Sequence, residues 1–130
     1  MSETLDSNRT KIFSLAFVAA ATTVISGLIH VLMGTFSEPG EEGQALFFLI
    51  GGVLQIFWAL PVIKGWDKLW QYVGIGGTAL LIILWLVTHI HGLSHGRGLG
   101  GMTLVLETSQ IAFIGLCIVL LNIRSRVRDL

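Results

Sequence analysis

The sequence predicts an all-α, polytopic membrane protein: an antiparallel four-transmembrane-helix bundle with its N- and C-termini in the cytoplasm. Three observations predict it, namely an apolar composition, four long apolar runs, and a one-sided distribution of Lys and Arg. Of the 130 residues, 53% are hydrophobic and 12% are charged, whereas soluble domains carry about 25% charged residues. A soluble domain of this length could not bury so much apolar surface. We therefore expect a lipid bilayer to be the solvent.

Four segments have the roughly 20 apolar residues that a helix needs to cross the hydrocarbon core. They cover about 12–33, 44–63, 69–90 and 102–123. A β-barrel is disfavoured because its strands alternate apolar and polar residues. The connections are short, so sequential helices should be antiparallel neighbours. The sequence thus predicts a single membrane domain over residues 1–130.

The direction of the helices follows from the basic residues. Seven of the eight Lys and Arg residues fall on one side of the predicted membrane, and only Arg97 falls on the other. The seven are Arg9, Lys11, Lys64, Lys68, Arg124, Arg126 and Arg128. Short cytoplasmic loops carry such an excess, and tryptophans such as Trp66 and Trp70 mark the interface. We expect a multi-pass protein of the cell membrane whose histidine-rich loop is extracytoplasmic.

Small and polar residues recur at spacings of three and four along each predicted span, and such residues mediate helix association in lipid. We expect four faces to meet inside the bundle: Ala16, Ala20, Thr23, Gly27 and His30; Gln44, Phe48, Gly51, Gln55 and Trp58; Gly74, Thr78, Leu81, Trp85 and Thr88; and Thr103, Glu107, Gln110, Ile114 and Cys117. The polar residues expected in the interior include Gln44, Gln55 and Gln110.

Glu107 is the one carboxylate within a predicted span. An ionisable group there costs about 2.5–3.5 kcal/mol on insertion scales and is a functional candidate by default. The alternative is structural: a hydrogen bond from Glu107 to His30, Gln44 or a backbone carbonyl. Both interpretations remain open at this point.

All four histidines lie at the predicted outer boundary. Imidazole and carboxylate groups suit zinc or copper, so the candidate metal ligands are His30, His89, His91, His95 and Glu107. The His91–His95 spacing suits two ligands on one helical face, whereas His89 and His91 could share a metal only in an extended segment. Half-solvated interfacial histidines are the alternative. Two histidines on facing helices, such as His30 and His89, could instead hold haem b.

The second half of the chain carries a pattern made of Trp85, Thr88, Gly96-Arg97-Gly98, Glu107, Gln110, Ala112 and Phe113, with His30 in the first half. This pattern resembles small uncharacterised four-helix integral membrane proteins of archaea and bacteria. The resemblance implies the same fold and topology and no particular activity. The sequence departs from it at His89 and His91, where Arg or other residues are expected, so a metal role shared by the family is in doubt for this pair.

The leading functional hypothesis is an integral membrane accessory subunit that packs against a larger complex, such as a respiratory or copper-dependent oxidase, without catalytic activity of its own. The chain is similar in size to accessory helical subunits of archaeal membrane oxidases, including the copper-dependent ammonia monooxygenase. The alternatives are a copper- or zinc-binding or transport protein and, third, a haem b electron carrier. The expected partners are the bilayer and other membrane subunits, or further copies of the chain. A net charge of zero argues against nucleic acid.

Overall fold

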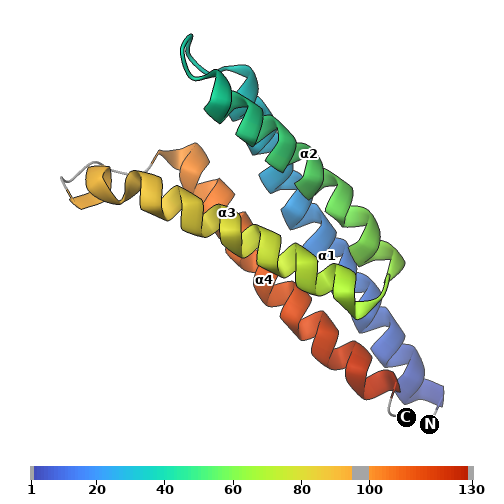
Figure 1. Cartoon of the computed structure of the whole chain (residues 1–130). Coiled ribbons are helices and arrows are strands. Elements are labelled where there is room, and N and C mark those ends of the chain that lie inside the picture. The colour runs from blue at the N-terminus through green and yellow to red at the C-terminus, as the bar shows by residue number, and fades with distance from the viewer. Residues whose placement is uncertain (1, 95–99, 129–130) are drawn as a thin grey trace.

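The computed structural model describes residues 2–94 and 100–128. This part of the chain forms four α-helices: α1 (Ser2–Thr35), α2 (Glu42–Lys64), α3 (Lys68–Ser94) and α4 (Gly101–Arg128). Each contains a segment long and apolar enough to cross a membrane. Successive helices run in opposite directions, and both ends of the chain lie at the same end of the molecule (Figure 1). The predicted all-α architecture with four membrane-length helices is confirmed.

The helices extend beyond the predicted spans. α1 begins ten residues before the predicted start at residue 12, in a polar stretch where the Thr10 hydroxyl donates to the Asp6 carbonyl oxygen. A span ends where the hydrocarbon ends, but a helix continues until a turn stops it. Gly40 (φ 98°) turns the chain between α1 and α2, and Gly65 (φ 64°) ends α2. Both need the left-handed region that favours glycine.

The helix pairs differ in how closely they pack. α1 lies along α2 with extensive contact, and it also packs on α4. α3 packs on α4 but contacts α2 sparsely, and it diverges from α2 toward the end remote from the termini (Figure 1). The expectation that sequential helices are antiparallel neighbours is thus confirmed for α2 and α3, although their contact is sparse. The bundle is open on this side.

Glycines allow the backbones of α1 and α2 to approach closely. A Cβ atom placed on Gly27 would lie 2.6 Å from the Gly52 carbonyl oxygen, and one on Gly52 would lie 2.6 Å from the Gly27 carbonyl oxygen. A Cβ atom placed on Gly34 would lie 2.8 Å from the Ala45 carbonyl oxygen. Small residues drive helix association in lipid by such close approach. They make α1–α2 the tightest interface of the fold.

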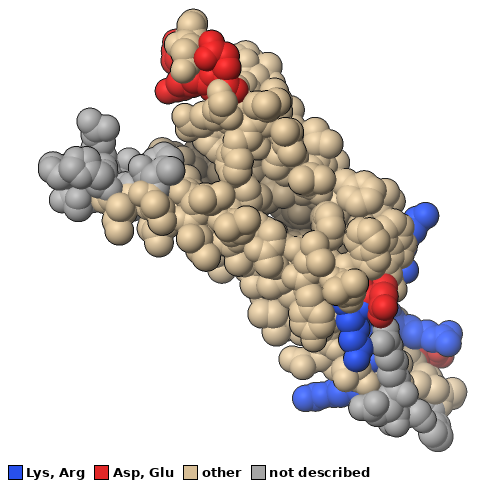
Figure 2. Space-filling view, viewed as in Figure 1, with Lys and Arg blue, Asp and Glu red and all other residues tan. Residues whose placement is uncertain are grey.

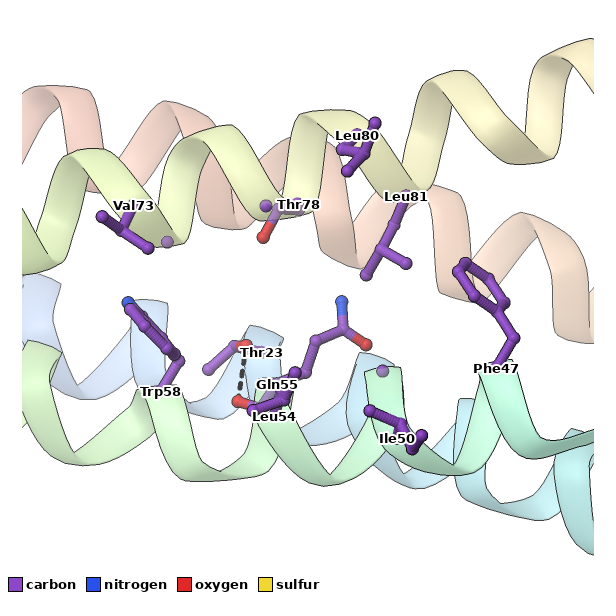
Figure 3. Close-up of a pocket in the computed structure, with 13 residues that line it drawn as sticks. Thr23, Phe47, Ile50, Leu54, Gln55, Trp58, Val73, Thr78, Leu80 and Leu81 are labelled. Atoms are coloured by element: carbon purple, nitrogen blue, oxygen red, sulfur yellow. Dashed lines mark hydrogen bonds between the residues drawn. The ribbon is translucent and has the colours of Figure 1, made fainter.

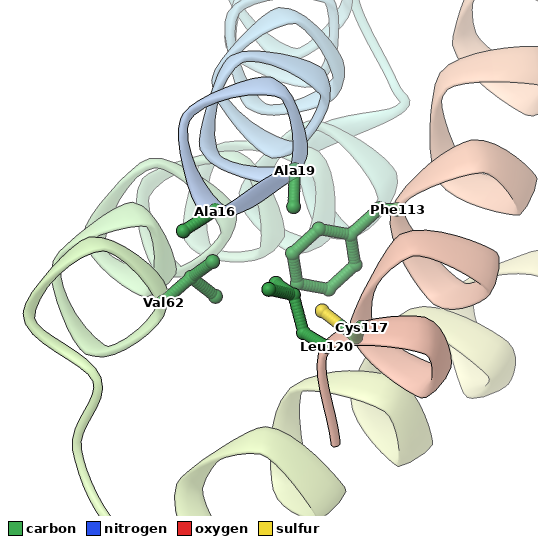
Figure 4. Packing of buried hydrophobic residues seen from close by; sticks show 6 residues of the cluster. All are labelled: Ala16, Ala19, Val62, Phe113, Cys117 and Leu120. Carbon is green, nitrogen blue, oxygen red and sulfur yellow. The ribbon is translucent and has the colours of Figure 1, made fainter. Parts of the chain in front are cut away.

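An apolar core lies where α1, α2 and α4 meet near the termini (Figure 4). It consists of buried residues from these three helices: Ala16, Ala19, Val62, Phe113, Cys117 and Leu120. A hydrogen bond of 3.1 Å from the Arg124 guanidinium to the Val62 carbonyl ties α4 to the last turn of α2. This end of the bundle is thereby closed.

Charge is unevenly distributed along the molecule. Lys and Arg gather at the end that holds the termini, where some acidic side chains also lie; a separate acidic group lies at the α1–α2 turn, and the surface between the two ends is uncharged in this view (Figure 2). Large apolar side chains are exposed along the helices; Phe13, Leu69 and Val87 are each at least 65% exposed. Such a surface suits lipid. Beside the basic end, the Trp66 and Trp70 rings lie 5.1 Å apart, as in an interfacial aromatic belt.

Candidate functional site

The predicted interior face of α1 is buried throughout: Ala16, Ala20, Thr23, Gly27 and His30. Two of the three glutamines expected inside are also buried, with Gln55 5% exposed and Gln110 1% exposed. Glu107, on the same face of α4 as Gln110, is half-buried. The polar residues of the bundle thus come from several helices, and α1 and α2 bring the largest group of them together.

Gln44 is a correction, because it is exposed and does not enter the bundle. Ala45 and Leu49 face α1 instead, opposite Gly34. Adjacent residues of a helix point about 100° apart, so a face shifted by one residue turns Gln44 outward. It lines an open groove at the acidic end, together with Glu38 and Glu41 of the turn.

His30 belongs to the α1–α2 interface. It is 4% exposed, and its Nδ1 donates to the Gln55 side-chain oxygen at 2.6 Å. The His30 ring stacks on Phe48, with ring centroids 5.5 Å apart and planes at 17°. One turn away, the Thr23 hydroxyl donates to the Gln55 backbone carbonyl at 2.9 Å. The sequence left open a hydrogen bond between Glu107 and His30. The structure instead shows His30 bonded to Gln55.

The predicted metal ligands are not brought together in the part of the chain that the structure describes. Among those residues, no three His, Cys, Asp or Glu side chains are grouped so as to hold a metal ion. His95 lies outside the described residues, as do the side chains of His89 and His91. The set of His30, His89, His91, His95 and Glu107 therefore stays a prediction.

Gln71 is a buried polar residue that the sequence analysis missed. It is 2% exposed and lies near the start of α3. A signal was present, because Gln71 precedes Gly74 and Thr78 at spacings of three and four and so continues their face. The predicted interior face of this helix started at Gly74, one turn after Gln71.

A cavity of about 340 Å³ lies between α2 and α3. Its walls are mainly apolar, from Phe47, Ile50 and Leu54 on α2 and Val73, Leu80 and Leu81 on α3. Gln55 and Thr78 extend into it from opposite sides (Figure 3). The Gln55 amide nitrogen is buried and has no hydrogen-bond partner among the described residues. The arrangement can hold a largely apolar molecule and donate a hydrogen bond to an acceptor atom on it.

The cavity is closed toward the basic end by Trp58, which also lines it. The indole of Trp58 donates to the Trp70 carbonyl at 2.8 Å, and the ring lies directly over Gly74. Because Gly74 has no side chain, α2 and α3 can approach here through the tryptophan. Beyond this contact the two helices separate.

Comparisons with protein-family models, curated proteins and solved structures found no significant match for this chain. The resemblance to small four-helix membrane proteins of archaea and bacteria therefore stays an expectation from the sequence.

Proposed function

We propose that this protein is a non-catalytic accessory subunit of a membrane complex, and that α4 packs against a helix of a larger partner. The observation that carries this proposal is a stripe of small and polar residues on the outward face of α4. The stripe recurs every seven residues, and all four members are exposed: Gly101, Thr108, Gly115 and Asn122. We call it the α4 stripe.

The α4 stripe serves no packing need within the described chain. A Cβ atom on Gly101 or on Gly115 would meet no atom within 4 Å among the described residues. A seven-residue period keeps one face turned toward a partner helix, and small or polar residues on such a face favour helix association in lipid. Exposed Leu104, Ile111 and Ile118 flank the stripe and would pack around the contact.

The charge distribution supports an orientation for the complex. Lys and Arg gather at the end with both termini, together with some acidic residues, whereas the charged residues of the α1–α2 turn are all acidic (Figure 2). Basic loops remain in the cytoplasm. The proposal therefore has cytoplasmic termini and an extracytoplasmic histidine-rich loop in the cell membrane. The class of complex predicted from the sequence is a respiratory or copper-dependent oxidase.

Mild extraction tests the proposal. The tagged full chain would be crosslinked in its native membrane, extracted in a gentle detergent and purified, and the co-purifying membrane proteins identified. We expect one larger protein in stoichiometric yield. We expect Gly115→Leu to lower its yield at least tenfold, because the side chain blocks close helix approach. Gly76→Leu is the matched control, since Gly76 is exposed on α3 and no atom of the described residues lies within 4 Å of its Cβ position.

Two outcomes would overturn the proposal. One is a monomer under every mild condition. The other is crosslinking only to a second copy of the chain, which would assign the α4 stripe to a homo-oligomer. Equal yields from Gly115→Leu and wild type would remove the stripe from the interface.

A further inference from the structure

The cavity between α2 and α3 holds two polar groups inside an apolar surround. Gln55 and Thr78 are each 5% exposed, and they reach toward the cavity from facing helices (Figure 3). Apolar side chains make up most of the remaining lining. Ligand pockets commonly combine apolar walls with a few convergent polar groups, and their volumes begin near 300 Å³. At about 340 Å³, this cavity suits one small ring system.

Only one of the two polar atoms of the Gln55 side-chain amide is hydrogen-bonded among the described residues. Its oxygen accepts from His30 Nδ1 at 2.6 Å, which aims the nitrogen at the cavity. That nitrogen has no hydrogen-bond partner among the described residues. A buried N–H without an acceptor is unfavourable, so an occupant that offers an acceptor would be stabilised. The Thr78 hydroxyl, opposite, can donate to the same acceptor.

The depth of Gln55 restricts the source of that acceptor. Gln55 lies 13 residues after Glu42 and 9 before Lys64 in α2, or about 20 Å and 14 Å along the helix. This depth is near the middle of a hydrocarbon core about 30 Å thick. Phospholipid ester groups lie outside that core and bulk water is absent from it. The acceptor must therefore belong to a molecule that carries a polar atom into the hydrocarbon.

Aromatic residues stand at the two ends of the cavity, with Phe47 at one end and Trp58 at the other (Figure 3). Aromatic rings pack favourably against other flat rings. Several lining residues also face outward: Ile50, Leu54 and Leu80 are each more than half exposed. A ligand could thus enter sideways from the bilayer. Together, these features favour a flat, lipid-soluble ring that carries a carbonyl oxygen.

We infer that the α2–α3 cavity binds a lipid-soluble carbonyl compound of the quinone class, whose oxygen accepts hydrogen bonds from the Gln55 amide and the Thr78 hydroxyl. The inference is independent of the proposed function, since the α4 stripe lies on another helix. It concerns binding alone and requires no electron transfer. It can be tested on the purified chain without any partner.

The experiment uses menadione, a naphthoquinone, and 2-methylnaphthalene, which has the same rings without the carbonyls. Menadione would be titrated into the full chain in nanodiscs while tryptophan fluorescence is recorded, because Trp58 lines the cavity. We expect saturable quenching. We expect 2-methylnaphthalene to reverse it only at about tenfold higher concentration, because it lacks the acceptor.

Gly77→Leu and Gly76→Leu form a matched pair of variants. Neither glycine has an atom within 4 Å of its Cβ position among the described residues, but only Gly77 lines the cavity. We expect Gly77→Leu to weaken menadione binding at least tenfold and Gly76→Leu to leave it unchanged. Thr78→Val keeps the shape and removes the hydroxyl, and it should weaken menadione several-fold without affecting 2-methylnaphthalene.

Three results would overturn the inference. Non-saturable quenching in wild type would show partition into lipid only. Equal affinity for the two probes would show an apolar cavity without carbonyl recognition. Equal binding by Gly77→Leu and Gly76→Leu would place the menadione elsewhere.

Discussion

His30 and Gln55 are joined by a hydrogen bond of 2.6 Å between Nδ1 and the side-chain oxygen, inside the α1–α2 interface. Both side chains are at least 95% buried. The bond has two effects: it satisfies the imidazole N–H, and it fixes the rotation of the Gln55 amide. Because Gln55 also lines the cavity between α2 and α3, the bond connects the α1–α2 interface to that cavity.

Loss of one partner from this bond should destabilise the fold. Gln55→Leu leaves the His30 N–H buried without an acceptor, and we expect a loss of about 1–3 kcal/mol in the free energy of unfolding. The measurement is SDS titration of the full chain in mixed micelles, followed by circular dichroism. A double-mutant cycle with His30→Leu should give a coupling of about 0.6–1.7 kcal/mol, the range seen for interhelical hydrogen bonds in membranes.

The control for this variant is Gln44→Leu, in the first turn of the same helix. Gln44 is exposed, so its replacement should change stability by less than about 0.5 kcal/mol. Equal losses for Gln44→Leu and Gln55→Leu would contradict the assignment of these two residues to outside and inside.

The close approach of α1 and α2 at Gly27 and Gly52 predicts a second pair of effects. Gly27→Ala would bring a Cβ atom within 2.6 Å of the Gly52 carbonyl oxygen. The helices must separate, at a cost of about 1–3 kcal/mol. Gly76→Ala meets no atom within 4 Å among the described residues and should be neutral or stabilising by up to about 1 kcal/mol. The same SDS titration measures both variants. A stabilising Gly27→Ala would contradict the close approach of α1 and α2 at Gly27 and Gly52.

The sequence predicted the parts of the fold that depend on local pattern. Apolar runs define the four helices because membrane thickness sets their length. The interior face of α1 could be predicted because Thr23, Gly27 and His30 are small or polar at helical spacing, while residues such as Phe17 and Leu28 on the other side are exposed. Such faces follow from one helix alone.

What the sequence could not predict depends on pairs of helices. Periodicity does not fix which of two adjacent faces of α2 meets α1, so the predicted interior face includes Gln44 and omits Ala45. Spacing placed Trp58 and Gly74 on interior faces, but it does not say that they meet each other or that α2 and α3 contact each other sparsely elsewhere. The cavity lies between these two helices. The amide of Gln55 could be recognised as a buried polar group from sequence, but its position beside a cavity could not.

The Trp58–Trp70 contact predicts where α3 opens. Trp58→Phe removes the indole donor that bonds the Trp70 carbonyl at 2.8 Å. We expect hydrogen exchange in the first two turns of α3 to accelerate about fivefold, the equivalent of roughly 1 kcal/mol. Trp66→Phe is the control, because Trp66 contributes ring contacts with Phe57 and Trp70 instead. Equal acceleration in both variants would assign the effect to the aromatic cluster as a whole.

The metal and haem hypotheses have a common test in His30. Its Nδ1 bonds Gln55 and its ring stacks on Phe48, in an interface that glycines hold closed. We therefore expect the same copper and zinc content, by elemental analysis, in wild type and His30→Ala, and no Soret band from either. Glu107→Gln is the companion variant. Metal lost from both variants would restore His30 and Glu107 as ligands, and a Soret band lost from His30→Ala would restore haem.

Membrane orientation can be decided by labelling single cysteines. The native Cys117 is fully buried and would be replaced by Ala, after which Glu38→Cys marks the acidic turn and Ser7→Cys marks the N-terminal end; both positions are exposed. Because basic residues remain in the cytoplasm, a membrane-impermeant maleimide added to intact cells should label Glu38→Cys and spare Ser7→Cys. Permeabilised cells should show labelling of both. The reverse pattern in intact cells would place the basic end outside, and with it the histidine-rich loop in the cytoplasm.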